Sequence, residues 1–312
     1  MTRPKSVLVG EVGPRDGLQI EQDFVPTATK IELINGLIDA GVKEIEYSSF
    51  VSPRAVPQLA DAAEVLAELD RSKGAHLVAL VPNAKGAERA VEAGVDELRV
   101  FISASESHNR KNVNSAIADS LRRFEEVMRI AEAAGRPVSG AIATSFGCPF
   151  EGEVRVEQIG MIAKHFSEFG MVGVGLGDTT GMATPPLVAE RCRHLKREVP
   201  ELPITLHFHN TRGIGLANVM AGLDEGIDRY ESSFAGLGGC PFAPGATGNI
   251  CTEDLVFLLH EMGIETGIDL EKLCAVARQV EQVVGRSLPG QVMKAGPRSN
   301  LAAMDQVETA VG

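Results

Sequence analysis

The sequence predicts a single TIM (β/α)8 barrel with additional C-terminal helices. Eight short apolar runs alternate with longer amphipathic stretches, and glycine repeatedly stands between a helical stretch and the next apolar run. This alternation is typical of βα units joined into a parallel sheet. The length of 312 residues suits one barrel, which usually takes about 250. A doubly wound open sheet is disfavoured because no GxGxxG motif follows the first apolar run.

Each expected strand is one of the short apolar runs. The eight are Val7–Val12, Glu44–Tyr47, His76–Leu80, Glu97–Ile102, Pro137–Ala143, Met171–Leu176, Ile204–Phe208 and Arg229–Ser233. Expected helices include Thr27–Ala40, Ala55–Asp70, Ala116–Ala134, Val156–Phe169, Leu187–Glu198 and Ile214–Glu225. Helix ends with left-handed glycine are expected at Gly41, Gly94, Gly170 and Gly226.

The chain is expected to form one catalytic domain over residues 1–286, which includes the C-terminal helices. A segment without periodicity follows over residues 287–312 and contains Pro289, Gly290, Gly296 and Pro297. We expect this tail to be poorly ordered.

Composition excludes several classes of function. The formal charge of −12 disfavours nucleic acid and anionic membrane surfaces, because both reward clustered Lys and Arg. No apolar run is long enough to span a bilayer. The N-terminal residues do not resemble a signal peptide, and the five cysteines lack close pairing. We therefore expect a cytoplasmic protein with free thiols.

Polar side chains gather where the expected strands end, which is where active sites form in such barrels. His207 and His209 are two residues apart on one strand, so both imidazoles face the barrel interior. Asp16 follows the first strand, Glu46 lies within the second, and Asn249 follows the eighth. Two carboxylates, two imidazoles and an amide suit Mg²⁺ or Mn²⁺.

Three further features have two interpretations each. Asp178 either orients a metal ligand or caps the turn after its strand. Cys240 lies among glycines and is either a reactive thiol, as a proton donor or a redox-sensitive group, or a loop residue without a role. Arg110 and Lys111 either meet the phosphates of a cofactor-like group at the same rim or form a solvated surface pair.

Several motifs surround these residues. They are Val12–Gln19, Ser49–Pro53, Leu176–Thr179, His207–His209, Gly236–Ala243, Gly245–Asn249 and Thr252–Val256. Together they resemble the 3-hydroxy-3-methylglutaryl-CoA lyases, within the metal-dependent barrel lyases and synthases related to isopropylmalate synthase. The resemblance extends to about Val284, and the motif around Cys240 is specific to the lyase branch.

The resemblance implies an acyl-CoA substrate, retro-Claisen cleavage to acetyl-CoA and a keto acid, and a homodimer. It implies that Asp16, His207, His209 and Asn249 bind the cation, with Glu46 at or just behind that shell. Arg15 would stabilise the enolate, and Cys240 would protonate it. Either Asp16 or His207 would serve as the base.

The chain departs from the family pattern at several positions on the rim. Ala141 replaces an expected tyrosine, Ser139 an arginine and Gly175 a serine, while Asn210 replaces an aspartate. Tyr47 and Arg212 are also unusual. These changes raise the alternative of a lyase for a bulkier or differently polar 3-hydroxyacyl-CoA. A condensing synthase and a non-catalytic CoA-ester binder are further alternatives.

Overall fold

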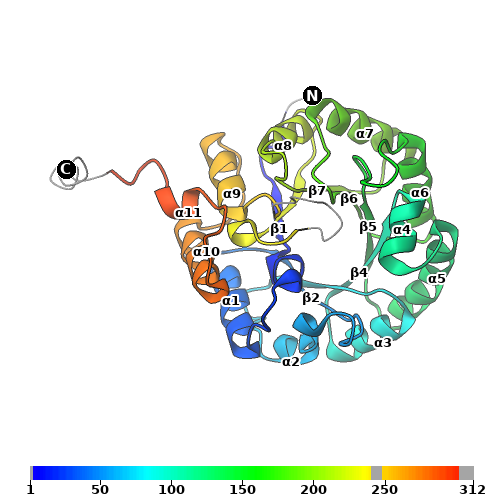
Figure 1. Ribbon diagram of the computed structural model, residues 1–312, viewed down its shortest axis with the longest axis horizontal. Helices are drawn as coiled ribbons and strands as arrows, with labels where there is room; N and C mark the ends of the chain where they lie inside the picture. Colours follow the sequence, from blue (N-terminus) through cyan, green and yellow to red (C-terminus); the bar gives the residue numbers. More distant parts are fainter. Residues whose placement is uncertain (1–2, 240–247, 302–312) are drawn as a thin grey trace.

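A computed structural model describes residues 3–239 and 248–301 of the chain. Eight parallel strands close into a barrel in sequence order, and the helices form a ring around it (Figure 1). The strands are β1 (Leu8–Glu11), β2 (Glu44–Ser49), β3 (His76–Leu80), β4 (Glu97–Ser103), β5 (Val138–Ala143), β6 (Val174–Asp178), β7 (Ile204–Phe208) and β8 (Arg229–Ser232). The predicted TIM barrel and its eight strands are confirmed.

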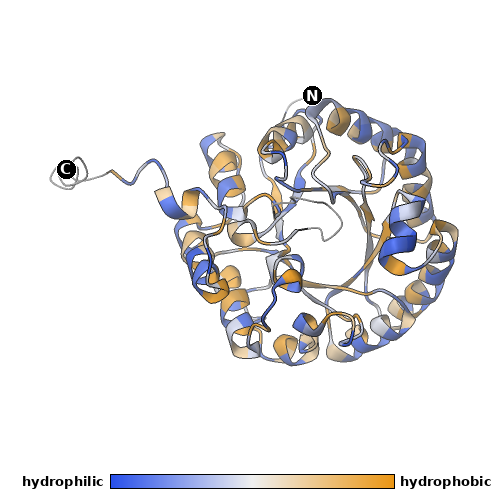
Figure 2. Cartoon of the chain, viewed as in Figure 1, coloured by the Kyte–Doolittle hydropathy of each residue, from blue (hydrophilic) through white to orange (hydrophobic). Residues whose placement is uncertain are grey.

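Most of the helices are longer than the strands, and they turn one apolar face toward the barrel. They are α1 (Thr27–Asp39), α2 (Ala62–Ala67), α3 (Ala84–Ala93), α4 (Glu106–Val113), α5 (Ile117–Ala133), α6 (Val156–Glu168), α7 (Pro185–Glu198), α8 (Gly215–Asp224), α9 (Thr252–Glu261), α10 (Leu270–Val284) and α11 (Val292–Ala295). Figure 2 shows polar residues on the outer side of the ring. None of the helices described is both long and apolar enough to cross a membrane.

Glycine ends the helices as the sequence predicts. Gly41, Gly94, Gly170 and Gly226 all have a positive φ, between 73° and 94°. A residue with a Cβ rarely adopts this left-handed conformation, so glycine lets the chain turn from a helix into the next strand.

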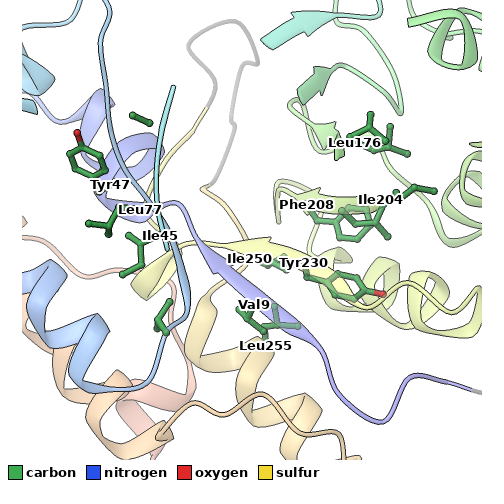
Figure 3. Close-up of a cluster of buried hydrophobic side chains, with 14 of the residues drawn as sticks. Val9, Ile45, Tyr47, Leu77, Leu176, Ile204, Phe208, Tyr230, Ile250 and Leu255 are labelled. Carbon is green, nitrogen blue, oxygen red and sulfur yellow. The ribbon is translucent and has the colours of Figure 1, made fainter. Parts of the chain in front are cut away.

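Aliphatic side chains fill the space between the strands and the helices. Figure 3 shows members of this cluster, including Val9 of β1 and Leu255 of α9, which are both almost completely buried. Tyr47 is also buried on this outer side of the sheet (Figure 3). Because neighbouring strand residues alternate in direction, the residues on either side of each core residue face the barrel interior.

Two expectations need correction. The helix predicted over Ala55–Asp70 is instead a short turn over Pro57–Leu59 followed by the six-residue α2. Pro57 lies where a continuous helix would need a backbone N–H donor, so the helix begins only after it. The segment predicted to be poorly ordered contains α11 between residues 287 and 301.

Packing explains why this C-terminal segment is structured. Leu288, Val292 and Met293 are buried, and Asp254 accepts hydrogen bonds from the backbone of Gln291 and Val292. Apolar burial and a capped helix start hold α11 against α9 and α10. Residues 302–312 lie outside the described part of the chain.

Candidate metal and catalytic centre

Three predicted ligands meet at the carboxyl end of the barrel. One ligand atom from each of Asp16, His207 and His209 lies within 4.8 Å of the others. The Nε2 atoms of the two imidazoles face each other at 3.2 Å. Two nitrogens and a carboxylate oxygen thus converge on one point, as the ligands of a divalent cation do.

Asn249 completes one side of this cluster. Its Nδ2 donates to Asp16 Oδ2 and to the carbonyl of Leu237, both at 2.9 Å. Its Oδ1 is buried and has no hydrogen-bond partner among the described residues. A buried amide oxygen without a donor suits a hard cation that prefers oxygen ligands. The side chains present therefore fit Mg²⁺ or Mn²⁺.

A tight turn over Gly13–Gly17 brings Asp16 into the cluster, and glycine is needed at both ends of it. A Cβ on Gly13 would lie 2.7 Å from Glu11 Oε1, and one on Gly17 would lie 2.8 Å from the Cβ of Leu237. Only glycine permits such close approach.

Neighbouring charged side chains keep Asp16 ionised. Burial raises the pKa of this carboxyl group, but the charges of Arg15, His207 and His209 outweigh burial and lower the pKa to about 2. Asp16 is therefore ionised at neutral pH.

Arg15 lies beside the cluster and is fixed by two carboxylates. Its NH1 donates to Asp16 Oδ1 at 2.6 Å, and its Nε donates to Glu46 Oε1. The other oxygen of Glu46 accepts from Arg99 at 3.0 Å. Of the two placements expected for Glu46, the one just behind the cation shell fits these contacts, because guanidinium groups occupy both of its oxygens and it lies outside the three-residue cluster.

His207 is oriented from behind by Glu231 of β8. The distance between His207 Nδ1 and Glu231 Oε2 is 3.0 Å, which directs Nε2 toward the cluster. Burial lowers the pKa of His207, but the hydrogen bond and the charge of Glu231 raise it overall. We did not predict Glu231 or Arg99 from the sequence. Their signal was a pair of charged residues two apart within an expected strand, as in Glu97/Arg99 and Arg229/Glu231.

Asp178 caps the turn after β6. Its Oδ1 accepts from the backbone N–H groups of Met182 and Ala183 at 2.7 and 2.8 Å. Its Oδ2 is buried without a hydrogen-bond partner among the described residues. Burial raises the pKa of Asp178 to about 7. The capping interpretation fits these contacts. The charge of His207 also acts on Asp178 and opposes the rise of its pKa, so a role toward that imidazole stays a prediction.

The three remaining candidates, Cys240, Arg110 and Lys111, are not part of the cluster described above. Cys240 lies outside the described residues. Arg110 lies on α4, which follows β4 at the same rim, and pairs with Glu106 at 2.8 Å while both stay largely exposed. Lys111 Nζ is 5.5 Å from the ring centroid of Phe150. Both cations lie at the edge of the rim, and their role toward a phosphate stays a prediction.

Apart from Tyr47, which is buried between the barrel and the helices, the residues that depart from the family pattern fall into two groups. Ser139, Ala141 and Gly175 line a cavity of about 30 Å³ inside the barrel. Asn210 and Arg212 instead support the rim: Asn210 Oδ1 accepts from Gly215 N at 3.1 Å, and Arg212 donates to two carbonyls of the loop after β6. The first group thus changes the interior of the barrel, while the second maintains its loops.

Comparisons with known proteins agree with this geometry. The HMGL-like family model matches residues 7–280. The chain is 44% identical to the hydroxymethylglutaryl-CoA lyase YngG of Bacillus subtilis, over 93% of this chain and 97% of that protein. It is 42% identical to the human mitochondrial hydroxymethylglutaryl-CoA lyase, over 94% of this chain and 90% of that protein.

Solved structures give the same result. An HMG-CoA lyase from Acinetobacter baumannii, in complex with coenzyme A and 3-methylmalate, aligns with a TM-score of 0.92 and 45% identity. That alignment covers 96% of this chain and 98% of the other. The carboxyl transferase domain of Rhizobium etli pyruvate carboxylase shares the fold at 19% identity and a TM-score of 0.70. Because the HMGL-like model matches most of the chain and the relatives are covered over nearly their whole length, the chain is a lyase that belongs to the HMGL-like family.

Proposed function

We propose that this lyase cleaves 3-hydroxy-3-methylglutaryl-CoA into acetyl-CoA and acetoacetate by retro-Claisen chemistry. The observation that carries the proposal is the convergence of Asp16, His207 and His209 within 4.8 Å, with Arg15 fixed beside them. Full-length relatives named as lyases of this substrate support it. In the reaction the bond between C2 and C3 of the acyl group breaks. C3 becomes the ketone carbon of acetoacetate, and the electron pair of the broken bond enters the enolate of acetyl-CoA.

Asp16, His207 and His209 would hold Mg²⁺ or Mn²⁺, with the amide oxygen of Asn249 as a further ligand. The bound cation would lower the pKa of the substrate's tertiary hydroxyl group and orient it. Arg15 is always charged and meets the negative charge that develops on the thioester oxygen.

Asp16 and His207 are the two candidates for the base that takes the hydroxyl proton. Asp16 is a weak base because its pKa is held at about 2. His207 presents Nε2 toward the cluster while Glu231 holds its other nitrogen. Because the same Nε2 would bind the cation, Asp16 and His207 both stay candidates for the base.

Cys240 is the proposed proton donor to the enolate, on the family resemblance alone. The cysteines of the described chain, Cys148, Cys192, Cys251 and Cys274, are all buried. Alkylation of the native protein is therefore expected to inactivate it through Cys240. A Cys240→Ser variant tests this, since its residual activity should no longer respond to the reagent.

Three further proposals concern the setting of the reaction. Arg110 and Lys111 would meet the phosphates of the acyl-CoA at the rim.

The protein would act in the cytoplasm, in line with the zebrafish relative named as cytoplasmic. It would form a homodimer, which light scattering of the purified protein measures directly.

The proposed reaction is tested with purified protein, Mg²⁺ and 3-hydroxy-3-methylglutaryl-CoA, with both products followed by mass spectrometry. Acetyl-CoA and acetoacetate should form in equal amounts, and EDTA should stop their formation. Folded, metal-loaded protein that forms neither product would refute the assignment. Incubation of acetyl-CoA with acetoacetate tests the condensing alternative.

A second candidate is a substrate with a larger 3-substituent, and one feature of the barrel favours it. Ala141 and Gly175 are neighbours on β5 and β6 and partly accessible. A Cβ added at Gly175 would meet no atom closer than 3.7 Å. The interior therefore has room for at least one further carbon atom at position 175, which glycine leaves unfilled. Measuring kcat/KM for a panel of 3-alkyl analogues of the substrate tests this candidate. A clear preference for the 3-methyl compound would exclude it.

A further inference from the structure

Arg99 of β4 lies at the centre of the barrel, beneath the proposed metal site. Its NH1 donates to Glu46 Oε2 at 3.0 Å and also to Glu231 Oε1. Its side chain is 9% exposed, and those of Glu46 and Glu231 are 1% and 8% exposed. One guanidinium nitrogen thus joins two carboxylates from β2 and β8 in a desolvated interior.

Each of these carboxylates uses its second oxygen on a residue of the site. Glu46 Oε1 accepts from Arg15, and Glu231 Oε2 is 3.0 Å from His207 Nδ1. An unbroken chain of charged contacts therefore runs from Arg15 to His207, with Arg99 in the middle. Among the described residues, the hydrogen-bond and ion-pair partners of Arg99 belong neither to the ligand cluster nor to the rim.

Charge explains why the middle position needs a cation. Glu46 and Glu231 bind the same nitrogen, so without Arg99 two buried carboxylates would face each other and repel. Glu44 and Glu97 lie 3.4 and 3.7 Å from Arg99 NH2 on the lower side. Burial lowers the pKa of Arg99, but these four carboxylates raise it well above its ordinary value, so it stays charged.

The position of Arg99 also accounts for a departure from the family pattern. Arg99 and Ser139 are register partners on the adjacent strands β4 and β5, and Arg99 Nε donates to Ser139 Oγ at 3.1 Å. An arginine is expected at position 139 from the resemblance. Here the guanidinium group enters the same space from the neighbouring strand, and serine at 139 leaves room for it.

We propose that Arg99 is a positioning residue for the lyase reaction, which holds Glu46 and Glu231 so that Arg15 and His207 face the substrate. The proposal rests on the roles assigned to Arg15 and His207 under the proposed function. It predicts that the site requires a guanidinium group at this place in the barrel, whether position 99 or position 139 supplies it.

The test exchanges the two register partners. Arg99→Ser should reduce kcat at least 100-fold with a smaller change in KM, because the oxyanion-stabilising arginine loses its support. The Kd for Mn²⁺, measured by electron paramagnetic resonance, should rise about tenfold as His207 loses its orientation. The double variant Arg99→Ser/Ser139→Arg should recover at least tenfold in kcat and most of the Mn²⁺ affinity.

Two controls separate positioning from folding. Lys30→Met removes a different buried ion pair, 2.7 Å long and far from the site, so it should lower Tm without changing Mn²⁺ affinity or kcat. Arg99→Lys keeps a charge but lacks the planar fork of donors, so it should fold and still lose most of its kcat.

The outcomes are decisive in either direction. Recovery of both kcat and Mn²⁺ affinity in the exchanged variant supports the proposal. Wild-type kcat in Arg99→Lys, or an exchanged variant that regains Tm but neither kcat nor Mn²⁺ affinity, overturns it. If the wild type does not cleave the substrate, the proposed function fails, while the Mn²⁺ affinities still test Arg99.

Discussion

Replacing Asn249 with alanine separates a metal-supporting role from a purely structural one. The side chain is 1% exposed and makes two hydrogen bonds, one to the charged carboxylate of Asp16 and one to the carbonyl of Leu237. A hydrogen bond to a charged group contributes about 1.5–3 kcal/mol, which corresponds to a factor of roughly 10–150 in an equilibrium constant. We therefore expect Asn249→Ala to weaken Mn²⁺ binding by about 10–150-fold.

A matched control exists on α8. Asn218 is also 1% exposed, donates Nδ2 to the carbonyl of Ala183 at 3.1 Å, and has a buried Oδ1 without a hydrogen-bond partner among the described residues. Asn218→Ala should lower Tm as Asn249→Ala does but leave Mn²⁺ affinity unchanged. Electron paramagnetic resonance titration gives the affinities and circular dichroism gives Tm. Equal Mn²⁺ affinity in Asn249→Ala and wild type would refute the reasoning.

Three other changes have defined outcomes. Burial raises the pKa of Glu253 to about 8 from 4.5, so the folded state holds this proton more tightly and stability falls as pH rises between these values, by about 4 kcal/mol at pH 8. Glu253→Gln should flatten that part of the Tm–pH curve, and an unchanged slope would contradict the assignment. Removing the metal with EDTA should lower Tm, because a cation at 100 times its Kd stabilises the fold by about 2.7 kcal/mol; scanning calorimetry checks this. Ala141→Val/Gly175→Ser should lower kcat/KM for a 3-propyl analogue relative to the methyl substrate by about 10–200-fold, and an unchanged ratio would show that these positions do not line the substrate pocket.

The fold was readable from the sequence because its signals are local. Apolar runs such as His76–Leu80 and Ile204–Phe208 match β3 and β7 at both ends. Left-handed glycines such as Gly94 mark helix ends by a constraint that needs no knowledge of tertiary structure. The helix predicted over Ala55–Asp70 was wrong because the amphipathic pattern was given more weight than Pro57.

The site was predictable in part. His207 and His209 share a strand, so their common direction follows from strand geometry alone. The pairing of Glu46 with Arg15 and Arg99 depends on the order in which the strands pair, which brings together residues 31 and 53 positions apart. A carboxylate inside a strand indicates a buried partner, but the sequence does not say whether that partner is a metal or an arginine.

The account depends most on the claim that one divalent cation lies between Asp16, His207 and His209. Anomalous diffraction at the manganese edge, from crystals grown with Mn²⁺, tests this directly. We predict a single strong peak roughly 2.1 Å from a carboxylate oxygen of Asp16 and from the Nε2 atoms of both histidines. A peak bound by other residues, or none at saturating Mn²⁺, would contradict the account.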